Sequence, residues 1–192
     1  MRVITGTAKG RHLATVKGRD IRPTADRVKE SLFNVLGPRV SGSEFLDLFA
    51  GSGGVGIEAL SRGARRCVFV ELMTPHLKVV EQNLAATGLT ERAELLRRDA
   101  RAAAADLGRR GCRFDLIFVD PPYGKGLVDD ALKEITAHRL LKPGGWVICE
   151  HHKKDAVLTE VVSQEQAGGL TRFRELVFGE TVISLYELGS PV

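Results

Sequence analysis

The sequence has 192 residues, 43% of them hydrophobic, and a formal net charge of +4. This length suits one domain, or one domain with a small extension, that buries its own core. No apolar run approaches the roughly 20 residues of a membrane span, and the N-terminus lacks the apolar core of a signal peptide. We therefore expect a cytoplasmic, monomeric protein with no membrane partner.

The positive charge is concentrated near the N-terminus. Residues 1–40 contain nine Lys or Arg and three acidic residues, a balance of +6, so the other 152 residues sum to −2. Basic side chains that neutralise phosphates supply most of the sequence-independent affinity for nucleic acid. The segment predicts contact with a polyanion, and a solvated basic surface is the alternative. The expected contacts to the polyanion are Arg2, Lys9, Arg11, Arg22 and Arg27.

The cysteine and histidine residues predict neither disulfides nor a metal site. Cys67, Cys112 and Cys149 are odd in number and widely spaced, and two of them lie in apolar runs typical of buried strands. The five histidines show no metal-ligand spacing. We expect reduced thiols and no bound metal.

The N-terminal 40 residues predict a small hairpin followed by a helix. Short β-like runs at residues 2–5 and 12–16 flank a turn that contains Gly6 and Gly10. Residues 22–36 then follow the helical period; Thr24 is the expected N-cap, and the expected core face is Val28, Leu32, Val35 and Leu36. We assign residues 1–20 to a basic arm and residues 21–192 to the main domain, with 21–37 as its leading helix.

From residue 44 onward, short apolar strands alternate with helices. This alternation predicts a parallel sheet with right-handed crossovers and a ligand at the carboxyl ends of its strands. The predicted strands cover residues 44–49, 67–71, 93–97, 115–119, 146–149, 171–178 and 181–187. The predicted helices cover residues 54–61, 74–86, a short stretch after Asp99, 128–137 and 157–162; a turn is expected at 142–145. The last two strands flank a tight turn, so an antiparallel hairpin ends a mostly parallel sheet.

A glycine-rich loop follows the first predicted strand. Gly51–Gly56 fits G-x-G-x-x-G, and Glu71 lies at the end of the next strand, where a carboxylate can accept both ribose hydroxyls of a nucleotide. This pattern alone would suggest a dinucleotide. Asp47 argues instead for S-adenosylmethionine, because a carboxylate beside the loop repels pyrophosphate and attracts the cationic methionine ammonium.

Asp120-Pro-Pro-Tyr123 follows the fourth predicted strand. The two prolines fix φ and remove two N–H donors, so the carbonyls around them are held rigidly. The Asp120 carboxylate and an adjacent carbonyl can accept both hydrogens of an exocyclic amine, while the Tyr123 ring offers a stacking face to a base. The motif predicts the binding of a planar NH2 group for methyl transfer; a Pro-rich turn is the alternative.

Asp99, at the end of the third strand, is a candidate partner for the adenine amino group of the cofactor. Leu72 and Met73 would pack on the adenine ring. A plain helix N-cap explains Asp99 equally well.

Three segments together, residues 22–33 (RPTADRVKESLF), Asp47–Gly53 (DLFAGSG) and Asp120–Tyr123, resemble the RsmD family of bacterial 16S rRNA guanine-N2 methyltransferases. The resemblance covers essentially the whole chain, and the Arg-Pro-Thr segment is its most specific part. It implies a Rossmann-like class I methyltransferase with a seven-stranded sheet, helices on both faces and an N-terminal β-hairpin. Its substrate would be one guanine of small-subunit rRNA, in a ribosomal particle or assembly intermediate.

The resemblance also implies roles for particular residues. Asp120, Pro121, Pro122 and Tyr123 would hold the guanine, and Thr24 and Arg27 resemble a segment that reaches the methionine end of the cofactor. The complete set of expected cofactor contacts is Thr24, Asp47, Ala50, Gly51, Ser52, Gly53, Glu71, Leu72, Asp99 and Ala100.

Three alternatives remain open at the level of sequence. A DNA adenine-N6 methyltransferase would use the same tetrapeptide, but only about 40 residues stand outside the sheet, too few for much reading of base edges. An NAD-dependent oxidoreductase would account for the glycine loop and Glu71. A non-catalytic rRNA-binding assembly factor would need only the basic N-terminus.

Overall fold

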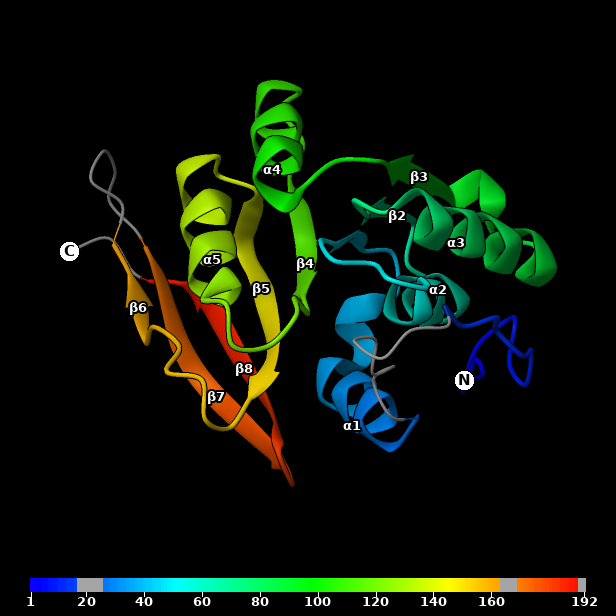
Figure 1. Ribbon diagram of the computed structural model, residues 1–192, viewed down its shortest axis with the longest axis horizontal. Coiled ribbons are helices and arrows are strands. Elements are labelled where there is room, and N and C mark those ends of the chain that lie inside the picture. The colour runs from blue at the N-terminus through cyan, green and yellow to red at the C-terminus, as the bar shows by residue number, and fades with distance from the viewer. Residues whose placement is uncertain (17–25, 163–168, 190–192) are drawn as a thin grey trace. The chain divides into compact units, whose positions relative to one another are not determined.

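The computed structural model describes residues 1–16, 26–162 and 169–189. These residues form two compact units, Met1–Asp99 and Ala100–Val192, referred to as unit 1 and unit 2 (Figure 1). The expected boundary between arm and main domain, at residues 20 and 21, lies outside the described residues.

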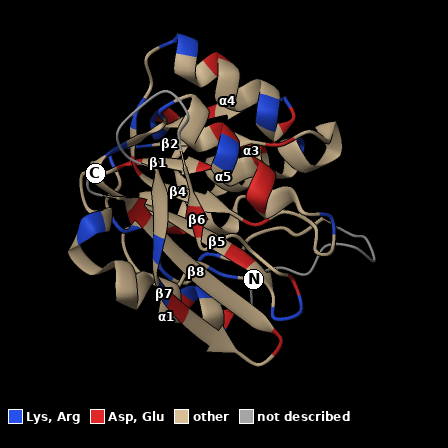
Figure 2. Ribbon diagram, turned by 90° about the vertical axis from the view of Figure 1, so that its left-hand side faces the viewer, with Lys and Arg blue, Asp and Glu red and all other residues tan. Residues whose placement is uncertain are grey.

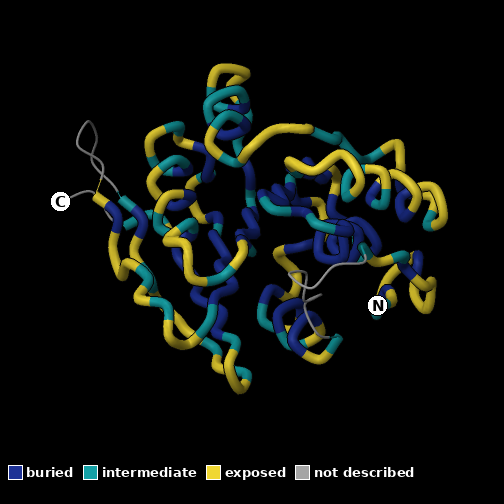
Figure 3. The backbone as a smooth tube through the Cα atoms, viewed as in Figure 1, coloured by how far each residue is buried: buried dark blue, intermediate teal, exposed yellow. Residues whose placement is uncertain are grey.

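Unit 1 contains a three-stranded parallel sheet in the order β3-β2-β1. The strands are β1 (Glu44–Asp47), β2 (Arg66–Val70) and β3 (Ala93–Leu96), connected by α2 (Gly54–Ser61) and α3 (Thr74–Thr87), with the 3-10 turn η2 (Thr90–Arg92) before β3. Every residue of α2 is buried, as Figure 3 shows by its dark colour. In β1 and β2 every residue except the first, Glu44 and Arg66, is buried, as expected for parallel strands covered on both faces.

The leading helix of unit 1 is α1 (Asp26–Leu36), which continues into the 3-10 turn η1 (Gly37–Val40). The start of the predicted helix, including Thr24, lies outside the described residues. Val28, Leu32 and Leu36 are buried as predicted, whereas Val35 is partly exposed. Phe33 and Lys29 are buried as well, and sequence periodicity did not place them in the core.

The described part of the N-terminal arm, residues 1–16, forms the predicted hairpin with an antiparallel bridge between Arg2 and His12. The N–H of Val3 donates to the carbonyl of Arg11 at 3.0 Å, and the N–H of Leu13 donates to the carbonyl of Met1 at 3.0 Å. Val3 and Leu13 are buried, so the arm is packed into unit 1.

Unit 2 contains five strands in the order β4-β5-β8-β7-β6. β4 pairs parallel with β5, and the remaining pairs are antiparallel. Its elements are α4 (Ala100–Arg109), β4 (Phe114–Val119), α5 (Leu127–Ala137), β5 (Leu141–His152), β6 (Glu160–Val161), β7 (Leu170–Phe178) and β8 (Thr181–Leu188). The tight turn between β7 and β8 has Gly179 at φ 64°, which confirms the predicted C-terminal hairpin.

Two predictions for unit 2 are wrong. The described residues contain eight strands rather than seven, because the predicted helix at 157–162 is an extended segment that contains β6. Leu158 and Val162 are exposed, so its apolar residues form no helical core face. The expected turn at 142–145 lies inside the longer β5, where the register with β4 shifts between Phe114 and Leu116.

The architecture otherwise agrees with the predicted α/β class. All three cysteines are free thiols, and Cys67 and Cys149 are buried, as expected. No group of three or more potential metal ligands occurs within the three described segments. None of the described helices is long and apolar enough to cross a bilayer.

Gly6→Ala should destabilise unit 1 far more than Gly10→Ala. Both glycines have left-handed φ, +91° and +83°, but a Cβ at Gly6 would lie 1.8 Å from the Ser61 carbonyl oxygen, while a Cβ at Gly10 meets nothing within 4 Å. We expect Gly10→Ala to cost about 1–2 kcal/mol of unfolding free energy from backbone strain, and Gly6→Ala about 1–3 kcal/mol more from the clash. Urea denaturation of both variants measures this; equal losses would show that the arm is not seated on α2.

Candidate functional site

The glycine loop between β1 and α2 leaves open space where a ligand can approach the backbone. Gly51 has φ +55°, and a Cβ there would meet nothing within 4 Å. The N–H of Gly53 donates to the carbonyl of Ala50 at 2.7 Å, and Gly53, at φ +80°, precedes the first residue of α2. Only glycine adopts such a φ without strain, so these two positions explain why the loop is rich in glycine.

Glu71 holds this loop from the end of β2. One carboxylate oxygen accepts from the N–H of Gly51 at 2.9 Å and the other from the N–H of Met73 at 2.7 Å. The His76 ring lies 3.5 Å from the second oxygen. A carboxylate offers about four acceptor positions, so Glu71 retains capacity for ribose hydroxyls while it orients the loop. Direct contact with the ribose stays a prediction.

Asp47 is the last residue of β1 and lies just before the loop in the chain. Its side chain is buried, and one oxygen accepts from the N–H of Gly56 at 3.1 Å in the first turn of α2. Burial raises the pKa of Asp47 to about 7; the N–H of Gly56 opposes this rise, and the negative charge of Glu71 adds to it. The carboxyl group therefore fixes the start of α2, a role that the sequence argument, centred on the methionine ammonium, did not include.

The other expected cofactor residues of unit 1 lie beyond β2 and β3. Leu72 and Met73 are neighbours in the chain and are 59% and 50% exposed, which is consistent with an apolar platform for a ring. Asp99 is exposed and separates β3 from α4, whose first residue is Ala100. Contact of these residues with adenine stays a prediction.

The tetrapeptide Asp120–Tyr123 directly follows β4 of unit 2. Pro121 is buried, Pro122 is exposed, and the Tyr123 hydroxyl donates to the buried Glu150 carboxylate at 3.3 Å. The His152 ring packs edge-on to the Tyr123 ring, with centroids 5.7 Å apart. Burial raises the pKa of Tyr123 to about 12, so its hydroxyl stays protonated and able to donate. Two residues of β5 therefore fix the ring, a role that was not predicted for them.

A cavity of about 230 Å³ adjoins this tetrapeptide within unit 2. Its walls include Pro121, Pro122 and Tyr123, together with two basic residues, Lys125 and Lys154, and two acidic residues, Asp129 and Asp155, so the formal charges of the lining balance. Drug-sized ligands usually occupy roughly 300–1,000 Å³, so this volume suits a single ring system better than a dinucleotide.

The basic residues of the N-terminal segment are exposed where they are described. Arg2, Lys9, Arg11 and Arg27 are accessible to solvent; Arg22 and Thr24 lie outside the described residues. Arg2 forms a long contact of 4.0 Å with Asp26, and Figure 2 shows basic and acidic residues interspersed over the elements of each unit. These four cations are therefore available to a polyanion, whereas Lys29, which the charge balance of the segment includes, is buried and paired with Glu58.

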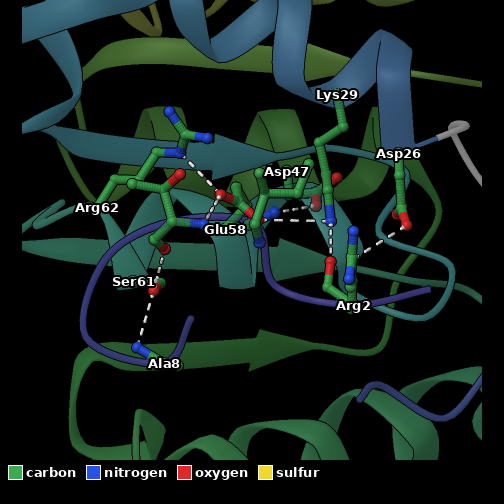
Figure 4. Close-up of polar contacts among 11 residues, drawn as sticks. Arg2, Ala8, Asp26, Lys29, Asp47, Glu58, Ser61 and Arg62 are labelled. Carbon is green, nitrogen blue, oxygen red and sulfur yellow. Dashed lines mark hydrogen bonds and ion pairs between the residues drawn. The ribbon is translucent and has the colours of Figure 1, made fainter. Parts of the chain in front are cut away.

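The arm is attached to unit 1 through a buried carboxylate that the sequence analysis did not identify. Glu58 of α2 accepts from the N–H groups of Ile4 and Thr5 at 2.8 and 3.0 Å. It also pairs with the buried Lys29 ammonium at 3.4 Å and the Arg62 guanidinium at 2.7 Å (Figure 4). The sequence contains a pattern that could have identified this pair. Glu58 and Lys29 interrupt otherwise apolar helix faces, and charged side chains are buried in proteins only when they have partners.

Ser61, one turn beyond Glu58, completes the attachment. Its hydroxyl donates to the carbonyl of Thr5 at 2.6 Å and accepts from the N–H of Ala8 at 3.0 Å. Lys29 also donates to the carbonyl of Arg2 at 2.7 Å. The arm backbone is thus bound over most of its length, and the basic side chains remain outside.

The sequence comparisons agree with this arrangement. The family model described as "Conserved hypothetical protein 95" matches residues 1–187. The chain belongs to this family, the RsmD family. It is 41% identical over 187 residues to a Bacillus subtilis protein named "Putative rRNA methyltransferase YlbH", covering 97% of this chain and 98% of that protein. It is 34% identical over 178 residues to the ribosomal RNA small subunit methyltransferase D of Haemophilus influenzae, covering 91% and 92%.

A solved structure also resembles the chain over its whole length. The Escherichia coli protein described as "Putative methyltransferase yhhF" aligns with a TM-score of 0.81 and 30% identity, covering 99% of this chain and 98% of that one. The similarity to this solved structure therefore extends over both units of the chain.

Asp47 should make the stability of the protein depend on pH. Its folded pKa of about 7 exceeds the unfolded value of 3.8, so the folded state retains a proton between about pH 4 and 7 that the unfolded chain has lost. The stabilisation of the folded state by this retained proton is complete below pH 4 and is lost as pH rises through 7. Three pKa units correspond to roughly 4 kcal/mol.

Asp47→Asn removes this dependence and keeps the shape of the side chain. The unfolding free energy of the variant relative to the parent should rise from pH 4 to 7 and then level off, measured by denaturant titration at each pH. Glu44→Gln, which changes a partly exposed carboxylate of the same strand, is the control. Parallel pH profiles for Asp47→Asn and the parent would contradict the assignment.

Proposed function

We propose that this protein transfers a methyl group from S-adenosylmethionine to the exocyclic N2 amine of a guanine in 16S rRNA, within the small subunit or its precursor. The observation that carries the proposal is the Asp-Pro-Pro-Tyr segment after β4, with Tyr123 held by Glu150 and His152 beside a cavity of about 230 Å³. The names of the relatives, rRNA methyltransferases of the small subunit, support the choice of substrate.

The residues of unit 1 fit the proposed cofactor. Gly51 leaves room for close approach to the backbone, Glu71 retains acceptor capacity for the ribose hydroxyls, and Leu72 and Met73 offer an apolar platform for adenine. Asp99 would accept from the adenine amino group. When bound, S-adenosylmethionine supplies a methyl group on a positively charged sulfur that is open to attack by an amine.

The residues of unit 2 would hold the acceptor. The Asp120 carboxylate and the Pro121 carbonyl accept the two hydrogens of the guanine amine, which turns the nitrogen lone pair away from the ring and toward the methyl group. Tyr123 stacks on the base with its hydroxyl anchored on Glu150. Positioning of this kind can lower the barrier of a two-substrate reaction by roughly 7–11 kcal/mol. The developing positive charge on nitrogen is stabilised by Asp120, which can also take up the departing proton.

Asp120→Ala should lower methyl transfer at least about 100-fold, because it removes an acceptor that acts on the reacting amine, while leaving RNA affinity nearly unchanged. The assay uses labelled S-adenosylmethionine with undermethylated small subunits, and mass spectrometry then locates the methylated guanine. Asp130→Asn, an exposed acid on α5, is the control. Normal transfer by Asp120→Ala would refute the assigned amine site.

The same preparation separates the proposal from its alternatives. Incubation with duplex DNA should give no labelled adenine, and calorimetry should detect binding of S-adenosylhomocysteine but not of NAD. Label in DNA adenine alone, or NAD binding without S-adenosylhomocysteine binding, would replace the proposed function.

Neutralising the arm should weaken RNA binding through electrostatics alone. Deletion of residues 1–20 would remove buried Val3 and Leu13, so we prefer the triple substitution Arg2→Gln, Lys9→Gln and Arg11→Gln, which changes exposed side chains. If each cation contacts one phosphate, the slope of log K against log salt should fall by about 2–3, measured by filter binding between 50 and 200 mM salt. An unchanged slope would place the RNA elsewhere.

A further inference from the structure

Asn83 of α3 is a buried amide that bonds to two separate segments of unit 1. Its Oδ1 accepts from the N–H of Ala14 at 2.8 Å, and its Nδ2 donates to the carbonyl of Ala14 at 3.0 Å. Nδ2 also donates to the carbonyl of Ser52 at 2.9 Å. The side chain is only 1% exposed. The reverse orientation of the amide would place its NH2 group against the N–H of Ala14, so the pattern of donors fixes this one.

One end of this bridge is the glycine loop. The carbonyl of Ser52 is held by Asn83, and the N–H of the same peptide group, from Gly53, donates to Ala50 at 2.7 Å. The peptide plane is therefore fixed on both sides. Because Gly53 at φ +80° leads directly into α2, the orientation of this plane sets how the loop presents its remaining backbone groups to a ligand.

The other end of the bridge is the arm. Ala14 follows the hairpin whose exposed basic residues are Arg2, Lys9 and Arg11, and whose backbone is bound by Glu58 and Ser61 (Figure 4). Both backbone groups of Ala14 are paired with the same amide, so a shift of the arm at this residue must move Asn83 or break two hydrogen bonds. A shift of Asn83 in turn releases the Ser52 carbonyl.

We propose that Asn83 is a positioning residue that couples the binding of RNA by the arm to the binding of the cofactor by the glycine loop. This inference rests on the proposed function. RNA that fixes the arm also fixes Ala14 and, through Asn83, the Ser52–Gly53 peptide. The cofactor then meets a loop with less conformational freedom left to lose, which gives positive coupling between the two ligands. By linkage, the cofactor tightens RNA binding by the same factor.

The test measures S-adenosylhomocysteine affinity by equilibrium dialysis, with and without saturating undermethylated small subunits. We expect the subunits to tighten binding by about 5-fold or more in the parent, within the usual range of coupling between sites. Asn83→Ala should weaken binding in the absence of RNA, reduce the coupling factor to about 1, and raise the KM for S-adenosylmethionine more than it lowers kcat. Thr87→Ala, one turn further along α3, should retain the coupling, because the Thr87 hydroxyl donates to the backbone carbonyls of Asn83 and Leu84 in its own helix and leaves the Asn83 amide untouched.

A second variant addresses the bridge from the arm side and leaves Asn83 in place. Ala14→Pro removes the N–H that donates to Asn83. It should keep S-adenosylhomocysteine affinity near the parental value without RNA and lose the coupling. This variant tests the inference even if Asn83→Ala does not fold.

The outcomes separate this inference from the proposed function. A parent protein that binds S-adenosylhomocysteine and methylates rRNA without any coupling would overturn the inference alone. Full coupling in either Asn83→Ala or Ala14→Pro would overturn it as well. A parent protein that binds no S-adenosylhomocysteine would overturn the proposed function, and this inference with it.

Discussion

The buried Glu58 carboxylate is the interaction on which unit 1 depends. It compensates the Lys29 ammonium, binds the Arg62 guanidinium and accepts two N–H groups from the arm, all from a side chain with no exposed surface. Burial lowers the pKa of Lys29, and the adjacent Glu58 opposes that shift. Loss of one partner from a buried ion pair typically costs roughly 3–5 kcal/mol, because the other charge is left without compensation. The arm, α1 and α2 are therefore interdependent parts of one structure.

Because the arm is attached to α2, the basic N-terminal segment of this chain differs from a flexible basic tail. A flexible basic arm would bind RNA wherever its charges could reach. Here the backbone is bound by Glu58 and Ser61 of α2, so the positions in the arm that carry the exposed cations are fixed relative to that helix. Because α2 begins at the glycine loop, the same helix carries the arm on one side and the loop at its N-terminus. Asn83 adds a direct connection between the two.

The glycine loop and the tetrapeptide are held in similar ways. Each follows a buried strand, and each donates a hydrogen bond to a carboxylate on, or directly after, a neighbouring strand. Glu71 at the end of β2 holds Gly51, and Glu150 of β5 holds Tyr123. Both carboxylates thus orient the groups that we expect to contact substrate. Neither role follows from the local sequence of the loop or the tetrapeptide.

The sequence by itself determined the elements, the α/β class, the C-terminal hairpin and the motifs after β1 and β4, because apolar period, glycine, proline and strand ends are local properties. It failed at 157–162, where apolar residues suggested a helix and pairing with β7 imposed an extended segment. It also failed to identify Lys29, Glu58 and Asn83, whose partners, apart from Arg62, lie 27 to 69 residues away in the chain. Such polar bridges depend on which distant backbone groups packing brings within about 3 Å, and only the tertiary structure decides that.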